Sequence, residues 1–147
     1  MKKPGTLKWA QGLSILQIIV DIAVIALLIW LVDAAPTNAF LIGVKQGFSE
    51  GMAESGIVYD YETAGYLSAI PLFGMVASIL TLVAIKFHTK KWGYTAMILM
   101  GLHFLGAIVN GGRALLSIII FVLLLTKSAK TYFGISEGVL TKEKKTS

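Results

Sequence analysis

The chain has no cysteine among its 147 residues, only three prolines, and charged side chains at only 14% of positions. The absence of cysteine excludes disulfide bonds, thiolate catalysis, cysteine-ligated metal sites and cysteine lipidation. It also excludes the quinone-linked thiol oxidoreductases, a class of small four-helix membrane enzyme. Soluble domains carry about 25% charged residues. The low charge, with 56% hydrophobic residues and a mean hydropathy of +0.77, therefore indicates a membrane protein.

Four apolar runs divide the chain, at residues 15–32, 65–85, 94–109 and 114–125. They predict a single-domain, all-α integral membrane four-helix bundle made of two antiparallel hairpins. The expected spans are about 11–33, 64–86, 93–110 and 112–127. The fourth run is short enough for a buried or re-entrant segment. We expect a span, continued through Thr126, Lys127 and Lys130, because the lysines can extend to the interface.

The positive charges predict the orientation. Of the 13 Lys and Arg residues, only Lys45 and Arg113 fall in the first and third connections. The rest flank the other ends of the spans, so we expect both termini in the cytoplasm, an outer loop at 34–63 and a cytoplasmic tail at 134–147 of a multi-pass cell-membrane protein. The net charge of +5 follows from this topology and suits anionic lipid, so we expect no nucleic-acid partner.

A cleaved signal peptide over residues 1–34 is the alternative interpretation of the first run, and it would leave three spans. The run is longer than the usual apolar core of about 7–15 residues. It also carries Gln17 and Asp21. Both features favour a retained membrane span.

Polar residues in the first span share one helical face. Gln11, Ser14, Gln17 and Asp21 recur at spacings of three or four residues. A polar stripe exposed to lipid would be costly, so we expect this face to point into the bundle.

Asp21 and His103 form the main candidate site. Counting from the ends of their spans places both near mid-membrane, where an isolated carboxylate costs at least about 2.5–3.5 kcal/mol. Gln17 and Asn110 extend the two faces, and Asp33 and Arg113 make a candidate outer charge pair. The site can act as a proton-responsive or substrate-coupling carboxylate. It can equally be a structural pair that fixes helix register.

A strip of small and polar residues marks the second span and predicts close helix packing. Its members are Ser68, Pro71, Gly74, Ser78 and Thr81.

The long first connection has helical periodicity over residues 38–55, with Asn38 as a candidate N-cap. We expect an amphipathic helix on the outer leaflet or over the mouth of the bundle. A partly ordered loop is the alternative, since an isolated helix of this length is marginal in water.

No recognised catalytic set is present, and one mid-span histidine with one aspartate is too small a set for a metal site. We therefore expect no enzyme activity, no metal and no cofactor. The small multidrug transporters are similar in having four short helices and an acidic residue in the first. Their acidic residue is a glutamate in a different context, and their connections are short, so no residue role is transferred.

Three functions remain open. The first is a non-enzymatic accessory or interaction protein of a bacterial membrane, whose partners would be the lipid bilayer and either further copies of the chain or another membrane protein. The second is a small oligomeric transporter or channel with Asp21 as its coupling carboxylate. The third is an immunity or resistance protein.

Overall fold

The computed structural model describes residues 2–109 and 115–135. Within these ranges the chain is 84% helix and has no strand, which confirms the expected all-helical class. The predicted site residues Asn110 and Arg113, and nearly all of the predicted tail 134–147, lie outside them. The helices are α1 (Gly5–Asp33), α2 (Ala39–Glu54), α3 (Tyr61–Phe87), α4 (Lys90–Val109), α5 (Leu115–Leu125) and α6 (Lys127–Tyr132).

Three of the described helices, α1, α3 and α4, are long and apolar enough to cross a membrane. They contain 29, 27 and 20 residues. At 1.5 Å per residue even 20 residues extend about 30 Å, the thickness of the hydrocarbon layer. These helices indicate a membrane-embedded protein, and they contain the first two predicted spans and nearly all of the third.

The fourth predicted span differs from the structure. Helix α5 has 11 residues, or about 16 Å, which is half of the hydrocarbon layer. The chain then leaves the helical conformation at Thr126, whose φ of −60° and ψ of 148° are those of an extended residue. The Thr126 hydroxyl accepts a hydrogen bond from the Ala129 amide and begins the separate helix α6. The expected continuous helix through Lys127 and Lys130 is therefore not formed, and the described part of α5, which begins at Leu115, is shorter than a span.

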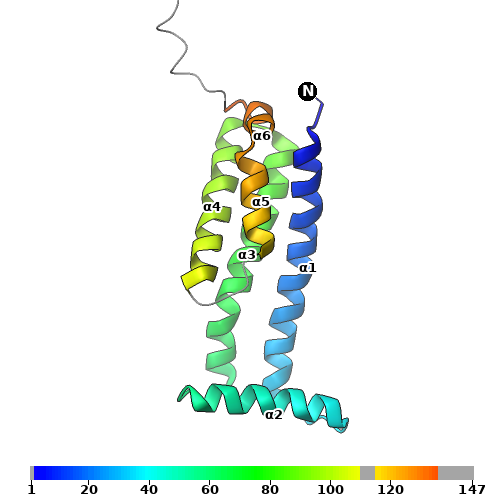
Figure 1. Cartoon of the computed structure of the whole chain (residues 1–147), viewed down its shortest axis with the longest axis vertical. Helices are drawn as coiled ribbons and strands as arrows, with labels where there is room; N and C mark the ends of the chain where they lie inside the picture. Colours follow the sequence, from blue (N-terminus) through cyan, green and yellow to red (C-terminus); the bar gives the residue numbers. More distant parts are fainter. Residues whose placement is uncertain (1, 110–114, 136–147) are drawn as a thin grey trace, which may run out of the picture.

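Helices α1, α3, α4 and α5 run alongside one another, and α2 lies across one end of this bundle (Figure 1). The N-terminus and α6 lie at the opposite end. We call these the α2 end and the α6 end. Helix α3 packs between α1 and α4, and α5 packs on α1 and α4. Figure 1 also shows that α5 stops well short of the α2 end, which α1 and α3 reach.

The α6 end holds the tightest apolar packing. The residues of α6 and the chain after it close over the ends of α1, α3 and α4. The buried residues there include Leu7, Ala10, Ile85, Ala129, Tyr132, Phe133 and Ile135. The Tyr132 hydroxyl donates to the Ile85 carbonyl at 3.2 Å, and the Thr6 and Ser128 hydroxyls are 3.0 Å apart. These contacts tie α6 to both α1 and α3.

Helix α3 turns its small residues inward. All five members of the predicted strip are buried. Pro71 lies inside the helix, which continues as one element through it. At its start, Asp60 accepts from the Thr63 amide at 2.9 Å, and this bond holds the pKa of the Asp60 carboxyl below its usual value. Because the strip packs inside the chain, it offers no free surface to a partner.

Helix α2 forms where the sequence allowed either an amphipathic helix or a partly ordered loop. The predicted cap Asn38 accepts from the Phe40 amide at 2.8 Å. Lys45 donates from Nζ to the carbonyls of Val32 and Ala34, at the carboxyl end of α1. A cation is favourable there because the unpaired carbonyls carry partial negative charge. None of the α2 residues is buried. Among the described residues, Lys45 makes the hydrogen bonds that attach α2 to the end of α1.

Gly93 in α4 is a contact point at the α6 end. A β-carbon at this position would lie 2.7 Å from both Cβ and Cγ of Phe133. Phe133 is only 1% exposed, so it has little room to move. We expect Gly93→Ala to lower the free energy of unfolding by about 1–3 kcal/mol through overpacking. Thermal unfolding in detergent measures this, and Gly12→Ala in α1, where a β-carbon meets nothing within 4 Å, is the control and should unfold no earlier than wild type.

Candidate intramembrane polar site

The polar face of α1 is buried in the bundle. Ser14, Gln17 and Asp21 are 0%, 3% and 8% exposed, whereas Ile19 is 59% exposed. A soluble helix of this length would show the opposite arrangement, with its polar side in water. The structure thus places polar atoms inside and apolar side chains outside, as the membrane interpretation of α1 requires.

Gln17, His103 and Ser117 form a hydrogen-bonded cluster that joins α1, α4 and α5. The Gln17 amide donates from Nε2 to Ser117 Oγ at 3.0 Å and to His103 Nδ1 at 3.3 Å. Ser117 Oγ lies 2.8 Å from the same Nδ1. Because Nδ1 accepts in this arrangement, the proton of the neutral imidazole is on Nε2.

Asp21 and His103 converge at Gly74 of α3. A β-carbon on Gly74 would lie 2.6 Å from His103 Nε2 and 2.7 Å from Asp21 Oδ2. Only a glycine leaves space for both atoms at this point. The structure therefore brings together the two residues that the sequence placed at similar depth. It does not give Asp21 Oδ2 a hydrogen bond, to His103 or to any other described residue.

Four buried oxygen atoms in the described part of the chain have no hydrogen-bond partner. They are Ser14 Oγ, Gln17 Oε1, Asp21 Oδ2 and Ser78 Oγ. Most buried polar atoms in proteins are paired with protein or with ordered water. Four such atoms on the facing sides of α1 and α3 therefore mark this interface as one that accommodates water or a ligand.

A cavity of about 560 Å³ adjoins this cluster. Its polar wall is formed by Gln17, Asp21, His103 and Ser117. The rest of its wall is apolar and continues toward the α2 end through Val20, Val24, Ile70, Pro71, Ala107, Leu115 and Leu116. The cavity lies beside the first described residues of α5, Leu115 to Ser117.

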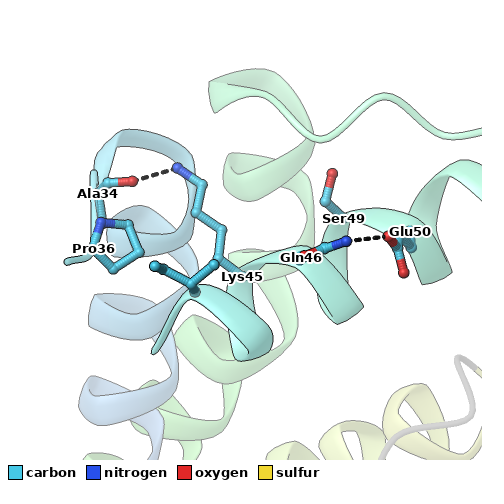
Figure 2. A pocket seen from close by; sticks show the side chains of 7 residues that line it. Ala34, Pro36, Lys45, Gln46, Ser49 and Glu50 are labelled. Atoms are coloured by element: carbon cyan, nitrogen blue, oxygen red, sulfur yellow. Dashed lines mark hydrogen bonds between the residues drawn. The ribbon is translucent and has the colours of Figure 1, made fainter. Parts of the chain in front are cut away.

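A second hollow of about 570 Å³ lies in the corner between the end of α1 and α2 (Figure 2). Three of its polar side chains have partners. Lys45 reaches the Ala34 carbonyl, and Gln46 donates to Glu50 at 2.8 Å. Ser49 also lines this hollow, which is a feature of the α1–α2 corner and lies apart from the Asp21 cluster.

The remaining predicted site residues do not belong to the described polar cluster. Asp33 interacts with the Tyr61 hydroxyl near the α2 end. Its proposed partner Arg113, and Asn110, lie outside the described residues. Among residues 2–109 and 115–135 there is no group of three or more His, Asp or Glu that could hold a metal ion.

The sequence analysis did not identify Ser117 as a site residue, although its position in the chain is distinctive. It is the single polar residue in α5, where every other side chain is apolar. A single serine in an apolar helix costs little free energy, so its presence did not by itself predict a polar site. The site needs it because it bonds to both Gln17 and His103.

Comparison with protein-family models, with curated proteins and with solved structures gives no match. The class of protein therefore follows from the fold and the site alone. They define an all-helical, membrane-embedded protein with a polar cluster enclosed among apolar helices.

Gly74 provides a test of the cluster's geometry. The atoms that a new β-carbon would meet are the ends of two side chains, which can rotate away. We expect Gly74→Ala to displace His103 and Asp21 while lowering the free energy of unfolding by only about 1 kcal/mol. The ring ¹⁵N chemical shifts of His103 measure the displacement. Gly65→Ala, with nothing within 4 Å of its β-carbon, should leave these shifts unchanged, and equal shifts in both variants would contradict the proposed contact.

Proposed function

We propose that this chain is a small multi-pass protein of the cell membrane that binds a cation at Asp21 and carries it across the bilayer. In this proposal α1, α3 and α4 are spans, and α5 with α6 completes a four-helix bundle. Both termini face the cytoplasm in this proposal, because lysines flank the ends of α1 and α3 that meet there, and Lys3 and Lys86 line one crevice.

The observation that carries the proposal is the unpartnered Oδ2 of Asp21 beside a cavity. A purely structural carboxylate would be expected to direct both oxygens at donors, since an unsatisfied charged group in lipid is expensive. Asp21 instead lines the cavity, and its buried Oδ2 has no partner among the described residues. A ligand or water in the cavity can complete its coordination.

The chemistry of the wall favours a cation. Among residues 2–109 and 115–135, Asp21 is the only acidic residue that lines the cavity, and no lysine or arginine of these ranges lines it. The long apolar part of the wall allows a lipophilic cation to serve as a probe of binding at Asp21. Binding and movement of such a ligand require no nucleophile or acid–base pair, so the proposed activity is not enzymatic.

A second candidate function is that of an accessory protein that binds a membrane partner. The observation in its favour is α2, which has no buried residue and exposes Phe40, Leu41 and Val44 to 75%, 39% and 37%. This face could lie on the outer leaflet or on a second protein. A protein that is strictly monomeric and has no co-purifying partner would argue against this candidate.

Replacement of Asp21 tests the main proposal. The probe is tetraphenylphosphonium, a lipophilic cation, and its binding to the purified protein in detergent is measured by titration calorimetry. We expect wild type to bind it and Asp21→Asn to lose at least about tenfold in affinity, because the amide removes the charge.

The matched control is Asp33→Asn, the same substitution at the other aspartate of α1, outside the cavity. It should bind the probe as wild type does. Equal affinity of wild type and a folded Asp21→Asn would contradict the proposed role of the carboxylate. Folding of each variant is checked by its thermal unfolding.

A further inference from the structure

A second crevice lies between α1 and α3 on the α6 side of the Asp21 cavity. This crevice, of about 340 Å³, is lined by Lys3, Gln11, Ile15, Leu82, Ile85 and Lys86. Lys3 donates from Nζ to Gln11 Oε1 inside it. Gln11 belongs to the same face of α1 as Asp21. The polar face of α1 therefore has the Asp21 cavity at one end and this crevice at the other.

Between the two hollows, polar atoms follow one another at successive helical turns. Along α1, Gln17 and Ser14 lie between Asp21 and Gln11. Along α3, Ser78 lies one turn from Gly74, the residue that contacts Asp21 and His103, and Thr81 lies about a turn further toward the α6 end. The two rows thus face each other across the α1–α3 contact.

The unpartnered oxygens lie in this stretch. Ser14 and Ser78 are fully buried at 0% exposure, and neither hydroxyl has a partner. Thr81 is also fully buried, but its hydroxyl donates to the Ala77 carbonyl at 2.9 Å. Serine hydroxyls in helices usually bond to a carbonyl of the preceding turn, as Thr81 does. Ser14 and Ser78 are available for water instead, and unpaired buried polar atoms are where proteins hold ordered water.

We propose that these atoms hold a file of water that conducts protons between the Asp21 cavity and the Lys3–Gln11 crevice. This inference rests on the proposed function, and it names the proton as the transported cation. Asp21 is the only ionisable group of the file, and it stands where the file meets the cavity.

The path between Asp21 and the Lys3–Gln11 crevice is unsuited to a metal cation. Between Asp21 and the crevice the described side chains offer hydroxyl and amide oxygens but no second carboxylate. Along α3, Ala77, Ser78, Thr81 and Ala84 are all fully buried, so this part of the helix is closely packed. Lys3 and Lys86 place positive charge at the crevice. A proton can pass along water without carrying a hydration shell through this contact, whereas a hydrated metal ion cannot.

Each step of the proposed path moves one proton from one group to the next. The Asp21 carboxylate takes a proton from water in the cavity and becomes a carboxylic acid. It then gives that proton to water held between Gln17 and Ser78, and the carboxylate is restored. The proton moves past Ser14 and leaves through the crevice beside Gln11, and no other group is altered.

The surroundings of Asp21 contain one other titratable group among the described residues. His103 of α4 faces it across Gly74. The α3 residues at this level, Gly74, Pro71 and Ser78, do not titrate, and neither does Ser117 of α5. The pH dependence of proton flow is therefore expected to reflect Asp21 and His103 together.

The test uses the full chain in liposomes that contain the pH dye pyranine, with a potassium gradient and valinomycin to drive proton entry. The test variant is Ser14→Ala with Ser78→Ala, which replaces two unpartnered hydroxyls and should fold as well as wild type. We expect its proton flux to fall at least about tenfold, because the water file loses its hydrogen-bonding partners. Its binding of tetraphenylphosphonium should be unchanged.

The control is Ser68→Ala, a buried serine of α3 whose hydroxyl donates to Ala64 at 2.7 Å, outside the file. It should conduct as wild type does. Wild-type flux in the folded double variant would overturn the proton file. Absence of wild-type flux with intact binding of tetraphenylphosphonium would also overturn the file but leave the cation site. Absence of both would overturn the proposed function itself.

Discussion

A carboxyl group in the middle of an apolar helix must be stabilised by its surroundings, and the structure is organised around that requirement at Asp21. Helix α1 turns its polar face inward, α3 meets it with its smallest residues, and α4 brings His103 to the same point. Gly74 makes this approach feasible because it has no side chain at the place where the two polar groups meet. The cluster nevertheless leaves Asp21 Oδ2 without a partner.

The cavity that Asp21 borders lies between helices of unequal described length. Helices α1 and α3 continue to the α2 end, whereas the 11 residues of α5 reach only part of the way (Figure 1). Ser117 near the start of α5 closes the cluster on one side, and the cavity wall continues toward the α2 end through Val24 and Ala107. At the α6 end, Phe133 and the residues of α6 belong to a buried apolar cluster, and the crevice between Lys3 and Lys86 lies beside it. The molecule thus has one hollow on each side of the buried polar face of α1.

Much of the fold follows from the sequence, because hydrophobic periodicity specifies helices and their faces. The spacing of Ser14, Gln17 and Asp21 already placed them on one side of α1. Periodicity does not specify which atoms meet, since this depends on how the helices rotate and how closely they approach. The contact of Asp21 and His103 with Gly74 is of this kind. The break at Thr126 was also missed, because a capping threonine within an apolar and basic run looks like one more residue of the span.

Thiol accessibility tests the central claim, that polar groups inside the bundle contact water while its exposed apolar surface contacts lipid. The absence of natural cysteine means that a single introduced thiol gives the whole signal. Thiols react as thiolates, which form in water and not in lipid. We expect Asp21→Cys to react with a small water-soluble thiosulfonate in membranes, although Asp21 is 8% exposed, and Ile19→Cys to stay unreactive, although Ile19 is 59% exposed. Faster reaction at position 19 than at position 21 would contradict the account.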